Sequence, residues 1–438
     1  MQYIIPLLLA VTFLSAPAIS SEKDDSTDKI SEIEKKVIQW RHHIHQYPEL
    51  GNSEFKTSEM VANHLRSLGF DEVQTQVAKT GVVGILVGGK PGPVVALRAD
   101  MDALPVAEKT GLPFASKETA IWRGQETGLM HACGHDAHTA ILMGVAELLA
   151  SQRSEIPGVV KFIFQPAEEG RPPGEEGGAK LMVEEGVLQG DYAPKAIFGL
   201  HVGPLRAGTI GYRSGGALAA SDGMHINIKG VQTHAAQPWA GVDPIVAAAQ
   251  VVTNMQSIVS RQVNITEEPA VVSFGSINGG NRGNIIPEDV TLVGTIRTFS
   301  EDTRNTVHDS IAKIAKHVAE SHGAEAEVKI RKGSGITYND PALVERMLPT
   351  LNKVALEGDV LPMPRLTGAE DFPYYTRDIP GFYFYLGVAP DGQNFKTAAP
   401  NHSPYFTVND KALKTGVSAL SQLALDWLTI ENSKTHQQ

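Results

Sequence analysis

The chain has 438 residues, of which 42% are hydrophobic and 20% are charged, and its formal net charge is −11. This length predicts two domains rather than one. The negative charge excludes a nucleic-acid-binding protein, because phosphate contacts need a concentrated surface of Lys and Arg. No apolar run after residue 20 is long enough to span a bilayer, so we expect no membrane contact once the leader is removed.

The first 20 residues carry no charged side chain and combine an apolar run with small residues near Ala18 and Ser20. This pattern is typical of an export signal. We therefore expect residues 1–20 to be a signal peptide and the protein to be exported, either periplasmic or secreted. With Cys133 as its one cysteine, the chain can form no internal disulfide, so this thiol needs another explanation.

Strands and helices alternate after the leader. Apolar residues from Ile30 to Ile44 fall at helical spacing and predict a helix that ends near Pro48. Further along, residues 83–89 form a predicted hairpin-like stretch, residues 93–100, 159–166 and 196–202 are predicted to be strands, and a helix is predicted to begin at about Asp136. This alternation predicts an α/β domain with a largely covered sheet.

The pattern changes between residues 218 and 332. The predicted order there is strand 223–230, helix 243–261, strands 270–277 and 289–299, helix 301–322 and strand 324–330. This βαββαβ order is the ferredoxin-like arrangement. Glycine-containing joints flank it, and α/β patterning returns with strand 381–388 and helix 413–428. We expect one domain built from residues 28–217 and 333–432, with residues 218–332 inserted into it.

Polar residues follow several of the predicted strands. In open α/β sheets, sites form in the crevice outside the carboxyl ends of the strands. The candidate ligands and bases placed at such ends are Asp100 and Asp102, Glu168 and Glu169, His201, and Asn401 with His402. We expect these side chains to converge.

Cys133 and His135 belong to the stretch HACGHDAH, at the predicted start of a helix. The helix N-terminus should favour a thiolate, and a thiolate two residues from an imidazole can bind a metal. Two alternatives remain open at this point. Cys133 is either a nucleophile activated by His135 or His131, or a buried cysteine without chemistry.

Glu168 and Glu169 are neighbours in an extended segment, so their side chains point in different directions. One carboxylate can then bind a metal while the other acts as general base towards water. We interpret seven other histidines as surface residues of helices, namely His42, His43, His45, His64, His308, His317 and His322.

Nine motifs occur in order over nearly the whole chain after the leader. They are RHHIHQYPELG, RADMDALP, MHACGHDAHTA, FQPAEEG, GLHV, QTHAAQPW, NIIPEDVTLVGTIRTF, TGAEDF and NHSP. Together they resemble the amidohydrolase branch of the aminoacylase and glutamate-carboxypeptidase metallopeptidases. That branch includes hippurate hydrolases and plant auxin-conjugate hydrolases.

The resemblance implies a two-domain α/β protein, in which a catalytic sheet domain carries an inserted ferredoxin-like lid that forms a homodimer. It implies two divalent ions of Zn, Mn, Co or Ni, with Cys133 as the bridging ligand. The metal-ligand positions fall on Cys133, His135, Glu169, His201 and His402.

Other roles follow from the same resemblance. Glu168 falls on the position of the general base, and Asp100 on that of an aspartate that orients a metal-binding histidine. His234 matches a histidine that stabilises the oxyanion, commonly from the partner subunit. Asn284 and Arg297 match positions that contact the substrate.

The resemblance predicts a metal-dependent amidohydrolase that cleaves N-acyl-amino acids, with metal-activated water and Glu168 as base. Two alternatives are a di- or aminopeptidase using the same metals and a non-catalytic metal-binding protein of the cell envelope. Two positions depart from the family pattern. Trp239 stands where many relatives have histidine, and Arg98 stands where peptidase relatives have a histidine ligand.

Overall fold

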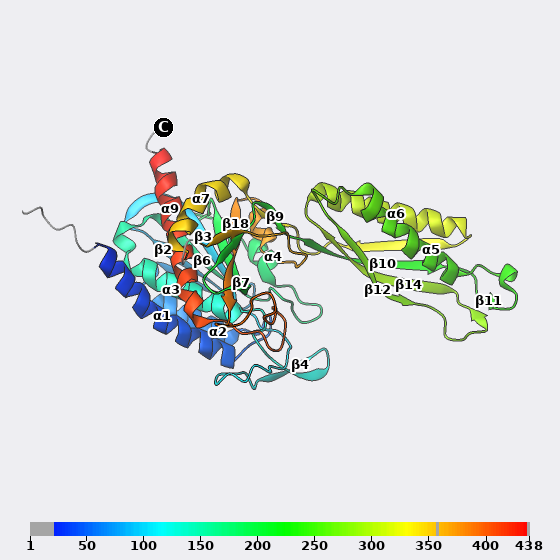
Figure 1. Ribbon diagram of the computed structural model, residues 1–438, viewed down its shortest axis with the longest axis horizontal. Helices are drawn as coiled ribbons and strands as arrows, with labels where there is room; N and C mark the ends of the chain where they lie inside the picture. Colours follow the sequence, from blue (N-terminus) through cyan, green and yellow to red (C-terminus); the bar gives the residue numbers. More distant parts are fainter. Residues whose placement is uncertain (1–21, 356–358, 436–438) are drawn as a thin grey trace, which may run out of the picture.

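The protein forms two lobes joined by a pair of connecting segments (Figure 1). The computed structural model describes residues 22–355 and 359–435, so the expected signal peptide lies outside the described residues. The larger lobe is built on an eight-stranded sheet and the smaller lobe on a four-stranded sheet. Within the described ranges, no helix has both the length and the apolar character needed to cross a bilayer.

The large sheet has a parallel centre with antiparallel neighbours. Strands β6, β3, β7 and β18 run parallel, and β2 and β8 pair antiparallel at either side of them. The sheet order is β1 (Glu72–Val77), β2 (Gly81–Val87), β6 (Pro157–Gln165), β3 (Lys90–Asp100), β7 (Ile197–Arg206), β18 (Gly381–Ala389), β8 (Ile210–Tyr212) and β17 (Val360–Pro362). The four central strands confirm predicted strands, and their near-continuous apolar runs reflect burial on both faces.

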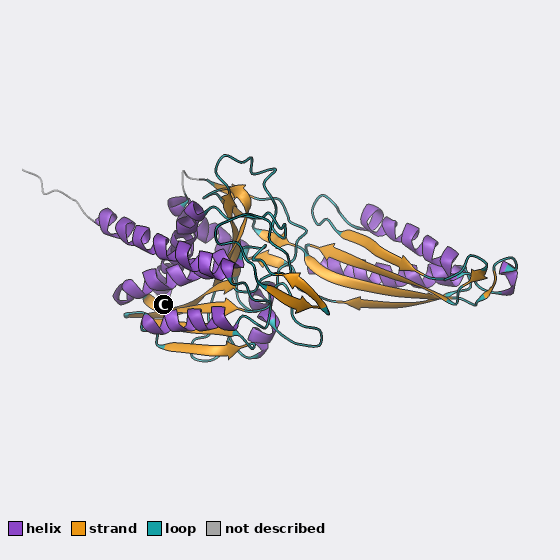
Figure 2. Ribbon diagram, turned by 90° about the horizontal axis from the view of Figure 1, so that it is seen from below, coloured by secondary structure: helices purple, strands orange, loops and turns teal. Residues whose placement is uncertain are grey.

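Helices cover both faces of this sheet (Figure 2). One face packs against α1 (Glu22–Gln46), α2 (Phe55–Ser67), α3 (His135–Ser151), α7 (Pro341–Val354) and α9 (Leu413–Thr435). The other face packs against the short helices α4 (Gly178–Glu184) and α8 (Pro373–Thr376). A two-stranded hairpin of β4 (Thr119–Trp122) and β5 (Gln125–Gly128) lies outside the sheet.

Helix α3 is buried along almost its whole length and fixes the position of its N-terminus. Its Gly144 lies where α1 and α9 approach. A Cβ atom there would lie 2.5 Å from Cγ2 of Val37 and 3.0 Å from Cγ2 of Val417. The glycine therefore lets three helices pack closely behind the start of α3.

The smaller lobe, called the lid below, confirms the ferredoxin-like arrangement. Its antiparallel sheet has the order β12 (Val271–Asn278), β14 (Asp289–Thr298), β10 (Ala220–Lys229) and β15 (Glu325–Arg331). Helices α5 (Pro244–Ser257) and α6 (Glu301–Ser321) cover one face, so side chains along β10 alternate between buried and more exposed. These elements all lie inside the predicted insertion, residues 218–332.

The lid extends away from the larger lobe and ends in a small hairpin of β11 (Thr233–His234) and β13 (Ile285–Ile286) (Figure 1). At its other end, two connecting segments run together as β9 (Gly215–Leu218) and β16 (Thr337–Asn339). A Cβ atom at Gly333 would lie 2.1 Å from the carbonyl oxygen of Ser221. Only glycine allows this close approach of the two segments.

Replacing Gly144 with Val should destabilise the protein by about 1–3 kcal/mol, because the added atoms collide with α1 and α9. Urea unfolding followed by circular dichroism measures the change. Gly275→Val is the matched control, since no atom lies within 4 Å of a Cβ at that position. Equal stability of the two variants would contradict the packing described for α3.

Candidate metal centre

The predicted metal ligands converge at the carboxyl side of the central strands. Two groups of possible ligand atoms each lie within 4.8 Å of one another: Cys133, His135 and His201 form the first, and Cys133, Glu169 and His402 form the second. Cys133 belongs to both groups. The residues come from the start of α3, from strand β7 and from the segments after β6 and β18.

Cys133 lies between two imidazoles. Its Sγ is 3.3 Å from Nε2 of His201 and 3.3 Å from Nε2 of His402. Nε2 of His402 is also 2.8 Å from Oε1 of Glu169. Cys133 and His201 are buried, whereas the side chain of His402 is 56% exposed, so the centre opens to solvent on the side of His402.

The hydrogen bonds around the histidines leave their Nε2 atoms available. His201 donates from Nδ1 to the carbonyl oxygen of Val202 at 2.7 Å, which leaves a lone pair on Nε2. Nδ1 of His135 lies 3.3 Å from Oδ1 of Asp102, and its buried Nε2 has no hydrogen-bond partner in the described part of the chain. A buried nitrogen without a hydrogen-bond partner is suited to bind a cation when sulfur and carboxylate oxygen atoms lie beside it.

Negative charge is concentrated around these ligands. Burial lowers the pKa of His135, but Asp100 and Asp102 outweigh it and raise the pKa to about 10. Burial has the largest effect on the Cys133 thiol, and the charges of Glu169 and Glu168 add to it. Together they hold its pKa well above its usual range. The thiolate expected at the helix N-terminus is thus wrong for the protein without a cation, because burial and two carboxylates outweigh the helix.

Glu168 lies beside the ligands and near two further acids. Possible ligand atoms of Glu168, Glu370 and Asp371 lie within 4.8 Å of one another. Burial raises the pKa of Glu168 most strongly, and the charges of Glu370 and Glu169 raise it further. The pKa therefore lies well above its usual range. The carboxyl group of Glu168 thus binds a proton more readily than an ordinary glutamate.

Buried carboxylates hold the backbone of residues 167–169, called the glutamate turn below. The two carboxylate oxygens of Asp102 accept hydrogen bonds from the N–H groups of Glu168 at 3.0 Å and Glu169 at 2.9 Å. Glu54 accepts the N–H of Ala167 at 2.8 Å. Ala167 has a φ of 53°, in the left-handed region that disfavours side chains, so these bonds hold a strained turn in place.

Arg98 is not a metal ligand in this structure. Its buried guanidinium donates to Asp100 at 2.6 Å, to Glu370 at 2.9 Å and to Asp371 at 3.0 Å. It therefore supplies a fixed positive charge to the carboxylates behind the centre. Glu370 and Asp371 were missed as site residues, although the motif TGAEDF that contains them was part of the resemblance.

Asp100 contacts a different histidine more closely than the ligand His135. Its Oδ1 lies 2.5 Å from Nδ1 of His138 and 3.7 Å from Nε2 of His135. His138 in turn accepts the N–H of Val202 at Nε2, at 2.8 Å, so this atom has no lone pair left for a metal. Asp102 makes the shorter contact to His135 and was not assigned that role from the sequence.

Three predicted site residues lie outside the centre. His234 is exposed on β11, at the far end of the lid (Figure 1), and the backbone carbonyl of Asn284 accepts the N–H of Ala235 beside it, at 3.0 Å. Arg297 lies at the opposite end of the lid, where its guanidinium donates to Oγ1 of Thr295 at 2.5 Å. The structure of one chain does not bring these three side chains to the metal ligands.

Two histidines interpreted as surface residues are buried. Nδ1 of His45 lies 2.9 Å from Oδ2 of Asp136, and Nε2 of His308 lies 2.8 Å from Oδ2 of Asp222. The surface interpretation was wrong because both partners come from distant parts of the chain. Asp136 also accepts Nε of Arg41 at 2.9 Å, so this network anchors α1 to the start of α3.

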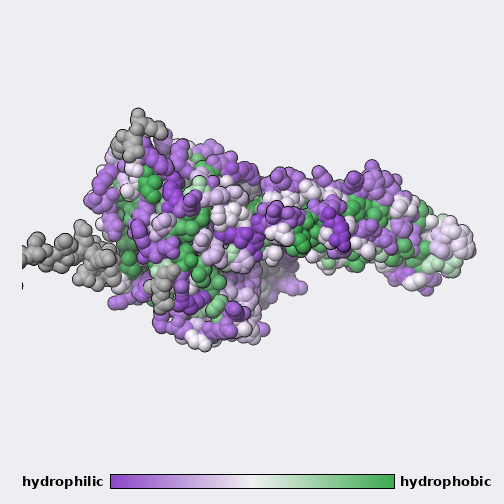
Figure 3. All heavy atoms as spheres, turned by 45° about the horizontal axis from the view of Figure 1, so that its top comes forward, coloured by the Kyte–Doolittle hydropathy of each residue, from purple (hydrophilic) through white to green (hydrophobic). Residues whose placement is uncertain are grey.

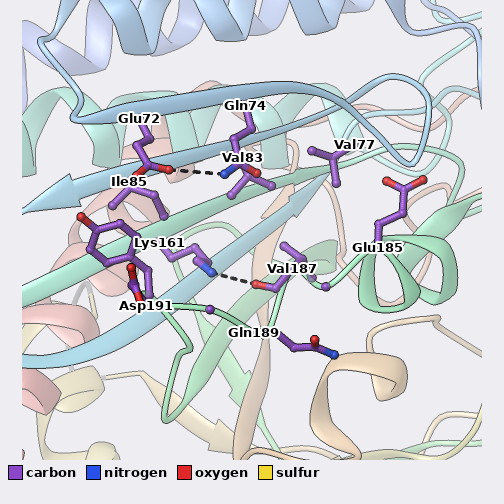
Figure 4. A pocket seen from close by; sticks show the side chains of 13 residues that line it. Glu72, Gln74, Val77, Val83, Ile85, Lys161, Glu185, Val187, Gln189 and Asp191 are labelled. Carbon is purple, nitrogen blue, oxygen red and sulfur yellow. Dashed lines mark hydrogen bonds between the residues drawn. The ribbon is translucent and has the colours of Figure 1, made fainter.

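A separate pocket of about 280 Å³ contains none of the predicted site residues (Figure 4). Lys161 on β6 points into it and donates to the carbonyl oxygen of Val187 at 2.8 Å. Burial lowers the pKa of this lysine to about 8. Because the possible metal ligands lie elsewhere, this pocket has no part in the centre.

The fold and the converging thiol, imidazole and carboxylate groups define a metallohydrolase. The model of Peptidase family M20/M25/M40 matches residues 96–426, and the chain belongs to this family.

Similar proteins agree with this assignment. The chain is 37% identical to N-acetyl-L-cysteine deacetylase of Bacillus subtilis, over 90% of this chain and 89% of that protein. It is 38% identical to thermostable carboxypeptidase 1 of Saccharolobus solfataricus, over 90% of this chain and 96% of that protein. A crystal structure of a dinuclear metal-binding peptidase of Bacillus subtilis superposes with a TM-score of 0.76 at 34% identity, over 91% of this chain and 99% of that chain.

Replacing Asp102 with Ala should weaken metal binding by about 10–100-fold, because both His135 and the glutamate turn lose their acceptor. Titration of the metal-loaded protein with a competing chelator measures the affinity. Asp378→Ala is the control, since Asp378 is exposed and lies outside the ligand groups. Equal affinity in the two variants would remove Asp102 from this role.

Proposed function

We propose that the protein is a metal-dependent amidohydrolase that cleaves the amide bond of N-acyl-amino acids with N-acetyl, N-benzoyl or related acyl groups. One observation carries the proposal. Cys133 belongs to two ligand groups at once, and Glu168, which forms a third group with His135 and Glu169, is not needed in either of them. A binding protein has no use for this additional carboxylate, which favours an enzyme over a non-catalytic metal-binding protein of the envelope.

Two divalent ions fit the donor atoms. In this proposal Cys133 would be a ligand shared by the two ions, with His135 and His201 from one group and Glu169 and His402 from the other. Such ions, when bound, polarise a carbonyl group and make water more acidic. The mixture of sulfur, nitrogen and oxygen donors suits Zn, Mn, Co or Ni.

Glu168 is the general base of the proposed reaction. Its carboxylate accepts a proton from the water that attacks the carbonyl carbon, and the same group then donates the proton to the nitrogen of the leaving amino acid. The raised pKa of Glu168 supports the second half of this role, because a carboxyl group that holds its proton is a better donor at neutral pH. The glutamate turn fixes the position of the backbone that carries this carboxyl group.

His234 completes the site from a partner subunit in this proposal. Its place at the far end of the lid separates it from the centre of its own chain. Hydrophobic side chains are exposed nearby, with Trp239 81%, Val231 53% and Val246 49% exposed, and Figure 3 shows hydrophobic surface along the lid. Exposed apolar groups of this kind support burial against another subunit, and hence a homodimer formed through the lid. Asn284 accompanies His234, and Arg297 contacts the substrate from the base of the lid.

A di- or aminopeptidase using the same centre is the second candidate, because peptidases occur among the relatives and a carboxypeptidase is as similar to this chain as a deacetylase is. The two functions differ in substrate. A di- or aminopeptidase requires a free α-amine, whereas an N-acyl-amino-acid amidohydrolase acts on a nitrogen that carries an acyl group. A cysteine hydrolase would instead retain activity with chelators and lose it on thiol alkylation.

A substrate panel with metal analysis tests the proposal. Purified protein is assayed for its metals and for hydrolysis of N-acetyl, N-benzoyl and indole-acyl amino acids and of dipeptides, with and without chelator. We expect hydrolysis of at least one N-acyl amino acid that is lost with chelator and restored by a divalent ion. Hydrolysis restricted to substrates with a free α-amine would favour the peptidase instead. The leader at residues 1–20 supports export, which cell fractionation tests.

Glu168→Gln should reduce hydrolysis by at least about 100-fold, because the amide cannot accept the proton of water. Metal content should stay at the wild-type value. Glu176→Gln is the control, since Glu176 is an exposed glutamate whose side chain is 59% accessible. Turnover at the wild-type rate would exclude Glu168 as the base.

His234→Ala should abolish most activity alone, yet recover it when mixed with Glu168→Gln. In a mixed dimer, one site combines an intact Glu168 with the partner's His234. Random exchange of subunits then gives about a quarter of the wild-type activity, because half of the dimers are mixed and each has one complete site. No recovery after subunit exchange, verified by mass spectrometry, would argue against a contribution from the partner.

A further inference from the structure

A large cavity lies between the two lobes. Its volume is about 860 Å³, within the range of small-molecule sites. Its walls come from α4 and α8 of the larger lobe, from the start of α6 in the lid, and from both connecting segments (Figure 1). None of its lining residues belongs to a group of possible metal ligands. We call it the interlobe cavity.

The lining of the interlobe cavity is positively charged, although the chain as a whole carries −11. Two carboxylates line it, Glu268 and Glu301, and they are outnumbered by the cationic side chains Lys180, Arg304, Lys332, Arg365 and Arg377. Three of these cations have carboxylate partners: Arg304 pairs with Asp222, Arg365 with Glu268, and Lys180 with Glu176. The other two, Lys332 and Arg377, have no ion-pair partner among the described residues.

Lys332 and Arg377 reach the lining of the interlobe cavity from two different parts of the chain. Lys332 belongs to the connecting segment after the last lid strand, and Arg377 follows α8 in the larger lobe. Two unpaired cations from different lobes can share one anionic group, since each supplies hydrogen-bond donors with full positive charge. This pairing would offset the excess positive charge of the lining.

Aromatic rings provide flat apolar walls beside these cations. The guanidinium of Arg377 lies 5.6 Å from the ring centre of Tyr374, and that of Arg365 lies 5.5 Å from that of Phe299. The ring of Tyr338 also lines the cavity, and the residue is 50% exposed. A planar body between such rings gains apolar contact in addition to its charge interactions.

We propose that the interlobe cavity binds a small organic anion, with a phosphate or carboxylate group held by Lys332 and Arg377 and a planar body against the aromatic rings. Such a ligand contacts both lobes and both connecting segments at Gly215 and Gly333. It therefore restricts the motion of the lid relative to the larger lobe. The support for this site does not rest on the proposed hydrolytic function.

Isothermal titration calorimetry of the metal-loaded full chain tests the proposal. Phenyl phosphate and isophthalate are the probes, since the first carries one phosphate and the second two carboxylates on a benzene ring. We expect at least one to bind the wild type, and Lys332→Ala/Arg377→Ala to lose affinity by about tenfold or more. If only phenyl phosphate binds, the site is specific for phosphates. If only isophthalate binds, it is specific for carboxylates.

The control Lys313→Ala/Lys353→Ala removes one exposed cation from each lobe without touching the interlobe cavity and should bind like the wild type. Lys332→Glu, a change at an exposed residue, should weaken binding at least as strongly and guards against misfolding of the double variant. Bound probe should also slow amide exchange in residues 214–216 and 332–336. The proposal fails if neither probe binds, or if the wild type and Lys332→Ala/Arg377→Ala bind equally.

Discussion

The centre depends on one buried carboxylate, that of Asp102. It accepts two consecutive backbone N–H groups, those of Glu168 and Glu169, and it also faces Nδ1 of His135. A single residue at the end of β3 thereby fixes the relative positions of a proposed ligand on α3 and of the turn after β6. Because Asp102 follows a central strand of a rigid sheet, all three positions are set by packing rather than by flexible side chains.

Charge balance forms a second constraint on the same region. Buried carboxylates cost free energy unless they are paired, and several gather here. Arg98 neutralises part of this negative charge, because it forms ion pairs with Asp100 and Glu370. Among the proposed ligands, His135 carries a proton when no ion is bound, since its pKa is raised to about 10. A cation there must displace that proton, so its affinity falls as the pH falls.

The sequence predicted those parts of the protein that are local or repeat a known pattern. Central strands such as β6 are continuous apolar runs, and the βαββαβ order of the lid follows from alternating periodicity. The convergence of Cys133 with His402 also followed from their places at strand and helix ends. Contacts between distant segments were not readable in this way. His45 has an ordinary surface pattern for a helix end, and only the fold brings Asp136 to it.

The same limit applies to Arg98 and Glu370, 272 residues apart in the chain. A charged residue inside a strand pattern indicates that a partner exists, but not which one. The pKa of the Cys133 thiol could not be predicted either, because it depends on two carboxylates that folding brings beside it.

Two residues of the centre, Ala167 and His402, adopt left-handed backbone conformations, with φ of 53° and 69°. Side chains make such conformations costly, so each is kept only by its surroundings. His402 follows a long loop and is held by the bond from its N–H to the carbonyl oxygen of Ala132, at 2.8 Å. When heat loosens these few bonds, both segments relax towards ordinary conformations while the sheet stays intact. Thermal inactivation should therefore precede melting of the fold, and the margin between the two temperatures reports on these two strained positions.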